Sequence, residues 1–178
     1  MTREVTMSAI DPRVEELLHR EEIHDVIKRL ARGTDRLDAE MMASCYHADG
    51  FDDHNSFRGS GQEFATWVLE ALAGFLATMH FIASPAIHLE GDVAQTDTYC
   101  VAHHVSKPDE EQRQHDIILG LRYVDRFERR DGKWLIAKRV CAFDWTYTLE
   151  VDAGRSFPFL EDFTVGHRDR SDITYTGV

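Results

Sequence analysis

Two tight turns constrain the fold of this 178-residue chain more than any other feature of its sequence. Gly91-Asp92 and Asp131-Gly132 each separate two long segments in which apolar residues alternate, which is the pattern of a β-hairpin. The expected strands cover residues 80–89, 93–105, 116–129 and 133–146, with a polar loop over 106–114. Pro85 inside the first strand predicts an edge position or a bulge, because proline cannot donate to a sheet ladder.

The first half of the chain has helical periodicity. Asp11 and Pro12 are typical of a helix start, and apolar residues then recur at helical spacing to about Arg32. A short helix and a third helix over residues 62–78 follow, with a strand over 51–57 between them. Helices followed by a run of strands predict an α+β fold. We expect a cone-shaped α+β barrel, in which three N-terminal helices pack on a curved antiparallel sheet and enclose a pocket, leaving the opposite face for oligomer contacts.

The length fits one domain with a substantial core. We expect a flexible arm over residues 1–10 and a single domain over 11–148. The remaining segment, 149–178, has apolar clusters without a clear period, and we expect it to cap the pocket or an oligomer interface.

Composition excludes several classes of partner. The net charge of −12 argues against binding to nucleic acid or to an anionic membrane surface. No apolar run approaches the ~20 residues that cross a bilayer, and the first residues lack the pattern of a signal peptide. The scattered cysteines Cys45, Cys100 and Cys141 predict buried thiols in a reducing, cytoplasmic environment.

Asp35 is the first candidate for a functional side chain. Gly33 is an ordinary helix stop, so Asp35 lies at the C-terminal end of the first helix, where the helix dipole disfavours a carboxylate. A functional role and a solvated turn are both compatible with this position. Asp38, by contrast, is predicted to be the N-cap of the next helix.

Three histidines lie on or beside the predicted strands. His80 is placed among large apolar residues, where a buried core histidine and a catalytic one are alternatives. His103 and His104 are adjacent, so strand alternation sends them to opposite faces. We expect His104 to face the pocket because its row contains small residues, although a bulge would reverse the order.

The sequence contains no spacing typical of a metal site, no glycine-rich phosphate loop and no nucleophile elbow. Asp52-Asp53-His54 comes nearest to a metal motif, and we interpret it as solvated residues at the end of a strand. What remains is a carboxylate with histidines and the basic Lys138-Arg139 around an apolar pocket. Such a pair suits proton abstraction beside a carbonyl or a leaving group.

Five segments together resemble a known family. They are EEI (21–23), ARGTDRLD (31–38), MHF (79–81), TYCVAHH (98–104) and FERRDGKW (127–134). With these segments the chain resembles the SnoaL-like branch of the nuclear transport factor 2-like superfamily, which includes scytalone dehydratase, bile-acid 7α-dehydratase and lindane dehydrochlorinase. The last segment is common throughout the superfamily and indicates only the fold.

The resemblance implies a catalytic site. The positions that match the family's Asp–His dyad are Asp35 and His80, a second histidine falls at His103 or His104, and a basic residue falls near Arg139. A family tyrosine is replaced by Thr34, and Tyr46 is expected to serve instead. Other expected substrate-binding residues are Thr34, Trp67 and Phe143.

The resemblance also implies a reaction class. We expect a lyase or isomerase without cofactor or metal, acting on a hydrophobic cyclic small molecule of steroid, polyketide or terpenoid type, in a homotrimer or homodimer. The alternative is a non-catalytic module of the same fold that binds a small molecule or another subunit, similar to the beta chains of ring-hydroxylating dioxygenases.

Overall fold

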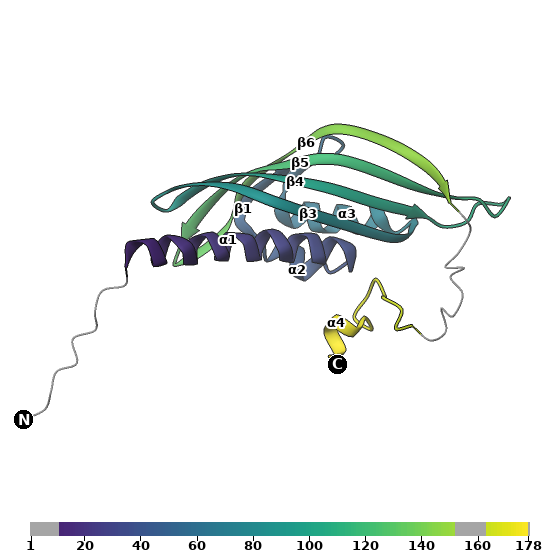
Figure 1. Cartoon of the computed structure of the whole chain (residues 1–178), viewed down its shortest axis with the longest axis horizontal. Helices are drawn as coiled ribbons and strands as arrows, with labels where there is room; N and C mark the ends of the chain where they lie inside the picture. The colour runs from purple at the N-terminus through teal and green to yellow at the C-terminus, as the bar shows by residue number, and fades with distance from the viewer. Residues whose placement is uncertain (1–10, 152–162, 178) are drawn as a thin grey trace, which may run out of the picture.

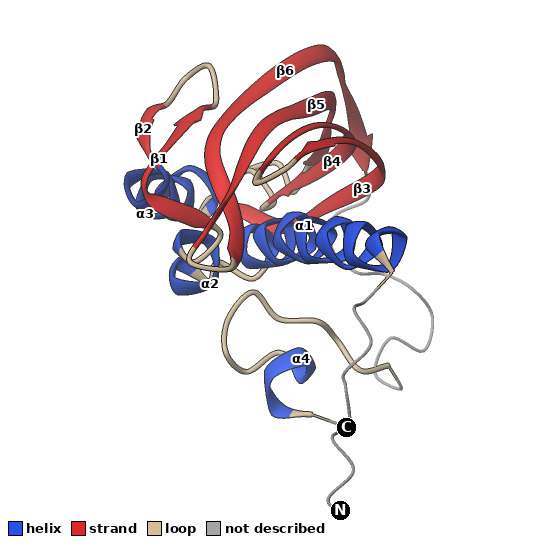
Figure 2. Ribbon diagram, turned by 90° about the vertical axis from the view of Figure 1, so that its left-hand side faces the viewer, coloured by secondary structure: helices blue, strands red, loops and turns tan. Residues whose placement is uncertain are grey.

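A six-stranded sheet coils over the helices and forms the wall of a cone (Figures 1 and 2). The computed structural model describes residues 11–151 and 163–177. In chain order the elements are α1 (Pro12–Asp35), α2 (Ala39–Ala43), β1 (Tyr46–Asp53), β2 (Arg58–Ser60), α3 (Gly61–Leu72), β3 (Phe75–Glu90), β4 (Val93–Ser106), β5 (Gln114–Arg130), β6 (Lys133–Val151) and α4 (Ile173–Thr176). The sheet order is β2-β1-β6-β5-β4-β3.

The four long strands form the expected antiparallel meander. Gly91 and Gly132 have φ of 58° and 75° at the two hairpin turns, a conformation that glycine adopts without strain. β3 lies at the edge, and its register shifts between Ala83 and Ala86, which confirms the prediction from Pro85. The sheet is not wholly antiparallel, however, because β1 runs parallel to β6. A parallel neighbour is possible here because α3 and the meander separate the two strands in sequence.

The helices differ in length from the prediction, and only two of the three precede the first strand. The short α2 has five residues, and α3 follows β1 and β2, so the three helices do not all precede the sheet. α3 ends at Leu72 and not at Thr78. Gly74 follows the last turn, and Phe75 then pairs with Ser106 of β4, so strand pairing replaces a continuation of the helix.

The core fixes α1 along the concave face of the sheet (Figure 2). Asp11 caps this helix by accepting the backbone N–H of Arg13 at 2.9 Å, and Asp38 caps α2 as expected. The indole of Trp134 donates to His19 at 3.1 Å, which adds a polar contact between β6 and α1. Buried residues at this contact are Ile23, Ile27, Leu30, Met42, Phe127, Trp134 and Ile136.

The outer face of the sheet carries exposed apolar side chains. Residues that alternate with the inward-facing ones on the long strands are Met79, Phe81, Tyr99, Trp145 and Tyr147, and each is more than two fifths exposed. The ring of Trp145 covers Gly120, where any Cβ would collide with it. Trp145 also stacks on Tyr147 at a centroid distance of 5.5 Å.

The described part of the C-terminal tail packs beneath α1 and α2, on the side away from the sheet (Figure 1). Tyr175 donates its hydroxyl to Asp38 at 2.9 Å, and Arg36 lies 3.5 Å from Asp172. Residues 149–151 belong to β6. The expected arm at 1–10 and the tail segment 152–162 lie outside the described residues, so the capping role stays a prediction.

The three cysteines are buried and free, which confirms the prediction of buried thiols. No helix in the described part of the chain is long and apolar enough to span a membrane.

Candidate active site

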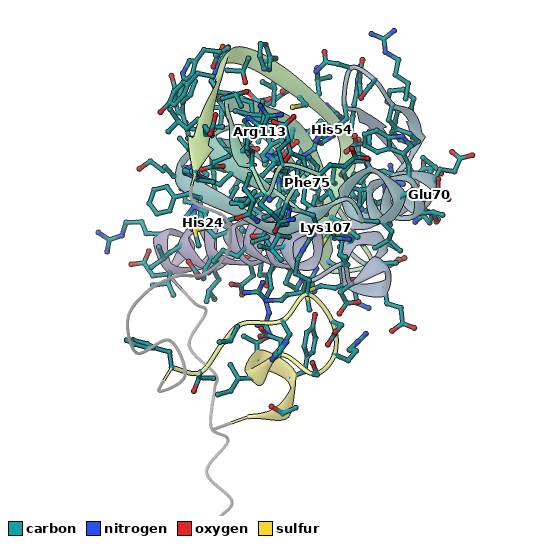
Figure 3. The ribbon with its side chains drawn as sticks, turned by 90° about the vertical axis from the view of Figure 1, so that its right-hand side faces the viewer. His24, His54, Glu70, Phe75, Lys107 and Arg113 are labelled. Carbon is teal, nitrogen blue, oxygen red and sulfur yellow. The ribbon has the colours of Figure 1, made fainter. Side chains whose placement is uncertain are left out.

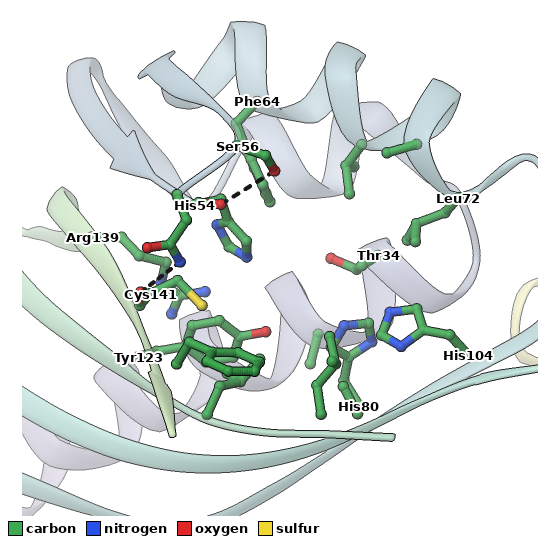
Figure 4. Close-up of a pocket in the computed structure, with 18 of the residues that line it drawn as sticks. Thr34, His54, Ser56, Phe64, Leu72, His80, His104, Tyr123, Arg139 and Cys141 are labelled. Atoms are coloured by element: carbon green, nitrogen blue, oxygen red, sulfur yellow. Dashed lines mark hydrogen bonds between the residues drawn. The ribbon is translucent and has the colours of Figure 1, made fainter. Parts of the chain in front are cut away.

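A cavity of about 250 Å³ lies between α1, α3 and the concave face of the sheet (Figure 4). Its sheet wall follows strand alternation, with every second residue of β5 and of β6 directed inward. These wall residues are Leu119, Leu121, Tyr123, Arg139, Cys141 and Phe143. Outside the cavity lining, Lys107 donates to the carbonyl of Ala73 at 3.0 Å and joins the β4–β5 loop to the end of α3, close to Phe75 (Figure 3).

Asp35 and His80 form a close pair at this cavity. Asp35 ends α1 and His80 lies on β3, with Asp35 Oδ1 2.7 Å from His80 Nδ1. The backbone N–H of His80 donates to Oδ2 at 3.0 Å, and the hydroxyl of Thr78 donates to Oδ1 at 3.0 Å. The carboxylate is therefore oriented by three hydrogen bonds. The imidazole of His80 lines the cavity, and its Nε2 does not contact the carboxylate.

The surroundings keep Asp35 ionised. Burial opposes its charge, but the hydrogen bonds from His80 and Thr78 hold the pKa of this carboxyl below its ordinary value. An ionised carboxylate can only accept, so it retains the proton on Nδ1 of His80 and leaves a lone pair on Nε2. The pair can therefore take a proton from a molecule in the cavity.

His104 lies on the same side of the sheet as His80, with ring centroids 5.5 Å apart and the rings edge to face. Burial, helped by the nearby His80, lowers the pKa of His104 from its ordinary value of 6.5 to about 4. His104 is thus neutral at pH 7. His103 points to the outer face instead, where its Nδ1 lies 2.7 Å from Asp116.

Two other expected site residues are tied to buried partners. Arg139 lines the cavity but forms a two-point ion pair with Asp125, both contacts at 2.7 Å, and lies 4.1 Å above the ring of Tyr123. Tyr46 is not in the cavity wall. It is buried behind the wall, against Gly61, and donates its hydroxyl to Asp52 at 2.5 Å.

The remaining expected substrate-binding residues all line the cavity. Thr34 donates its hydroxyl to the backbone of Leu30 at 2.9 Å, so only its oxygen is left to accept. Trp67 of α3 and Phe143 of β6 contribute apolar surface. Other apolar lining residues are Phe64, Val68, Ala71, Leu72 and Ala102.

The structure corrects the interpretation of Asp52 and His54 as solvated. Asp52 is fully buried and His54 lines the cavity, because β1 pairs with both β2 and β6 and is covered by α3. The spacing of two residues, which places both on one face of a strand, was the available signal. Tyr123 was also missed, although alternation with Leu119 and Leu121 predicts that it faces inward.

Among the described residues, no group of three or more His, Cys, Asp or Glu side chains is placed to hold a metal ion. Cys141 lines the cavity, but burial raises the pKa of its thiol to about 11. A protonated thiol is a poor nucleophile, so we assign Cys141 to the apolar surface of the cavity.

Comparison with known proteins now decides the family. The sequence profile of the SnoaL-like domain matches residues 15–140, most of the chain. The chain belongs to the SnoaL-like family. Its fold agrees with the nuclear transport factor 2-like superfamily that the sequence resembles, and an uncharacterised protein of Mycobacterium tuberculosis is 24% identical over 130 residues, covering 71% of this chain and 86% of that protein.

Solved structures share this SnoaL-like fold. The hexachlorocyclohexane dehydrochlorinase LinA-type3 from Novosphingobium barchaimii is 19% identical, with a TM-score of 0.66 over 82% of this chain and 98% of its own. A candidate scytalone dehydratase from Novosphingobium aromaticivorans is 20% identical, with a TM-score of 0.65 over 78% and 93% of the two chains. At these identities the likeness concerns the fold alone.

Proposed function

We propose that this SnoaL-like protein is a lyase or isomerase that needs no cofactor and acts on a hydrophobic cyclic small molecule. The observation that carries the proposal is the 2.7 Å contact between Asp35 and His80 at the wall of an apolar cavity. The names of the two structural neighbours, a dehydrochlorinase and a dehydratase, describe eliminations and support this class. A binding pocket alone does not need an oriented, ionised Asp–His pair.

His80 is the general base in this proposal. Its Nε2 removes a proton from a ring carbon next to a carbonyl group, and Asp35 stabilises the imidazolium that forms. His104 is neutral and donates a hydrogen bond to the carbonyl oxygen. Arg139 acts through its contact with Tyr123, and Thr34, Trp67 and Phe143 hold the ring. The proposal extends to a cytoplasmic homotrimer or homodimer.

Hydrogen–deuterium exchange tests the base without knowledge of the natural product. In D₂O, the wild-type protein is expected to catalyse exchange of the protons next to the carbonyl of indan-1-one, followed by proton NMR. Asp35→Asn and His80→Gln should each lower the catalysed rate by roughly 10²–10⁴-fold, the usual contribution of a positioned base. Circular dichroism establishes that both variants fold.

His88→Gln is the matched control. His88 also contacts a carboxylate, Glu90 at 3.0 Å, but both side chains are exposed and outside the cavity. This variant should retain the wild-type rate. Unchanged exchange in Asp35→Asn and His80→Gln, or no exchange by the wild type with any one- or two-ring ketone, would contradict the proposal and favour the binding module.

A further inference from the structure

A second Asp–His pair lies in the wall of the same cavity. Asp52 is fully buried on β1, and its Oδ1 lies 2.7 Å from Nδ1 of His54. Its other oxygen accepts the hydroxyl of Tyr46 at 2.5 Å. The His54 ring stacks on Phe64 of α3 at a centroid distance of 4.6 Å and lines the cavity. One buried carboxylate thus orients a ring that faces the cavity.

The turn that carries His54 is fixed on both sides. The backbone N–H of His54 donates to the carbonyl of Phe57 at 2.9 Å. The side chain of Asn55 donates to the carbonyl of Cys141 on β6 at 3.1 Å, and Asn55 has a φ of 61°, which asparagine tolerates better than most residues. A ring held this firmly has the pre-organisation that catalysis requires.

The position of His54 complements that of His80. Figure 4 shows His54 across the cavity from His80 and His104. Among the described residues, the hydrogen-bond partner of His104 is the carbonyl of Ile117, at a long 3.4 Å, and His104 is neutral at pH 7, so it has no ready proton to give. An elimination needs an acid for the leaving group as well as a base.

The other charged groups around His54 have ion-pair partners of their own. The titratable and charged groups that face it are Asp52 and Asp53 on β1, Tyr123 on β5, and Arg139 and Cys141 on β6. Arg139 is matched by Asp125, and Asp53 is matched by Arg58 at 3.1 Å. Burial raises the pKa of the phenol and of the thiol, so both stay neutral. In the described part of the chain, the ion-pair partner of Asp52 is His54.

We propose that His54 is the general acid of this site, positioned by Asp52 and Tyr46. The inference rests on the proposed function, because it requires His80 as the base. A base and an acid on opposite walls fit an elimination in which the proton leaves from one face of the ring and the hydroxyl group from the other.

The proposed step is balanced without a further reagent. His80 Nε2 takes the proton from the carbon next to the carbonyl group, and the electrons of that C–H bond form the C=C bond. The C–O bond to the hydroxyl group breaks, and the departing oxygen takes the proton from Nε2 of His54. Water and a cyclic enone leave, His80 is protonated and His54 is neutral, and exchange with solvent restores both.

The cavity limits the size of the substrate. Its volume of about 250 Å³ equals that of about eight water molecules at ~30 Å³ each. This is just below the ~300–1,000 Å³ of sites for drug-sized ligands. With largely apolar walls and titratable groups at opposite sides, it fits one or two rings with two oxygen functions.

The test compares two compounds that differ by one leaving group. Indan-1-one has exchangeable protons next to its carbonyl, and 3-hydroxyindan-1-one has in addition a hydroxyl group that can leave as water to give inden-1-one. We expect wild-type protein to exchange protons of the first and to dehydrate the second, measured by NMR and by absorbance of the enone. His54→Gln and Asp52→Asn should slow dehydration at least 100-fold, while exchange falls less than 10-fold.

A binding measurement accompanies the rates. The ring signals of His54 and His80 are followed by NMR with each compound, and 3-hydroxyindan-1-one should shift both signals while indan-1-one shifts mainly that of His80. His88→Gln, with its exposed histidine–carboxylate pair, is the control for the substitution and should retain both rates.

The outcomes separate the two proposals. Loss of exchange and dehydration to the same extent in His54→Gln, or an unmoved His54 signal with 3-hydroxyindan-1-one bound, overturns the acid role. A wild-type protein that exchanges the protons of indan-1-one but does not dehydrate 3-hydroxyindan-1-one also overturns the acid role. If the wild type does not exchange protons but the His54 signal shifts on addition of 3-hydroxyindan-1-one, the base role of His80 is wrong, and His54 only contacts the ligand.

Discussion

His80 and His104 lie side by side on neighbouring strands, but their partners give them different properties. His80 contacts an ionised carboxylate, whereas His104 contacts a backbone carbonyl and is buried to 7% exposure. Burial and the proximity of His80 lower the pKa of His104 to about 4. A histidine with such a pKa makes protein stability depend on pH.

The sign of this dependence follows from proton uptake. In the unfolded chain His104 binds a proton below its ordinary value of 6.5, and in the folded protein it does so only near pH 4. The free energy of unfolding therefore decreases by roughly 3 kcal/mol in total as the pH falls from 6.5 to 4. His104→Gln should show a shallower fall of unfolding free energy between pH 7 and pH 4.5 in urea titrations. A slope equal to that of wild type and of His88→Gln would contradict the prediction.

At the level of single residues the sequence indicated one Asp–His pair and missed the other. Asp35 stands out because it ends a helix, where a carboxylate is unfavourable, and His80 because its neighbours are large and apolar. Their pairing was an implication of the family resemblance. For Asp52 and His54 the local signal is only their spacing of two residues, which does not indicate that they are buried. Their burial depends on β1 pairing with β6, more than 80 residues later in the chain, and on the cover that α3 supplies.

Arg168 joins three elements whose ends meet beside the dyad. Its guanidinium donates to the carbonyl of Leu72 at the end of α3 at 3.0 Å and to that of Phe75 at the start of β3 at 2.9 Å. It also donates to the carbonyl of Asp35 at the end of α1 at 3.3 Å. It also reaches the hydroxyl of Thr78 at 3.3 Å. A cation is favourable at the C-terminal ends of helices, where carbonyls lack partners.

Removal of this guanidinium should therefore destabilise the fold. We expect Arg168→Met to lower the free energy of unfolding by ~1.5–3 kcal/mol, the range for hydrogen bonds to charged groups, measured by urea denaturation. Lys107→Met is the matched control, because Lys107 donates to one nearby carbonyl, that of Ala73, from an exposed position. Its effect should be smaller. Equal stability of Arg168→Met and wild type would show that the tail does not hold these ends together.

The prediction of elements succeeded where local chemistry decides and failed where pairing decides. Hairpin turns, the N-caps at Asp11 and Asp38, and the bulge near Pro85 follow from local preferences. The end of α3 does not, because the apolar spacing through Phe75 fits a helix as well as a strand. The parallel β1–β6 pair could not be predicted from neighbouring residues at all.

On the scale of the whole molecule, the outer face of the sheet is unlike the surface of an ordinary monomer. Met79, Phe81, Tyr99, Trp145 and Tyr147 are exposed on one face, next to the His103–Asp116 pair. Contiguous exposed apolar surface of this kind commonly marks a protein–protein interface.

We predict that this face joins copies of the chain. Light scattering after size-exclusion chromatography should give two or three times the chain mass of 20.5 kDa for the wild type, and Trp145→Asp should shift the mass toward that of one chain. Leu17→Asp, on an exposed position of α1 away from the sheet face, should leave the mass unchanged. A monomeric wild type, or a Trp145→Asp variant that stays assembled, would contradict the prediction.

The three tryptophans of the chain occupy three separate environments: Trp67 lines the cavity, Trp134 is in the core beside α1, and Trp145 covers the outer face. Indole emission responds to polarity, so the protein contains its own optical reporters. A change in emission that is confined to one indole distinguishes filling of the cavity, loss of the folded core and assembly of copies. The same chain thus records ligand, stability and oligomeric state without any attached dye.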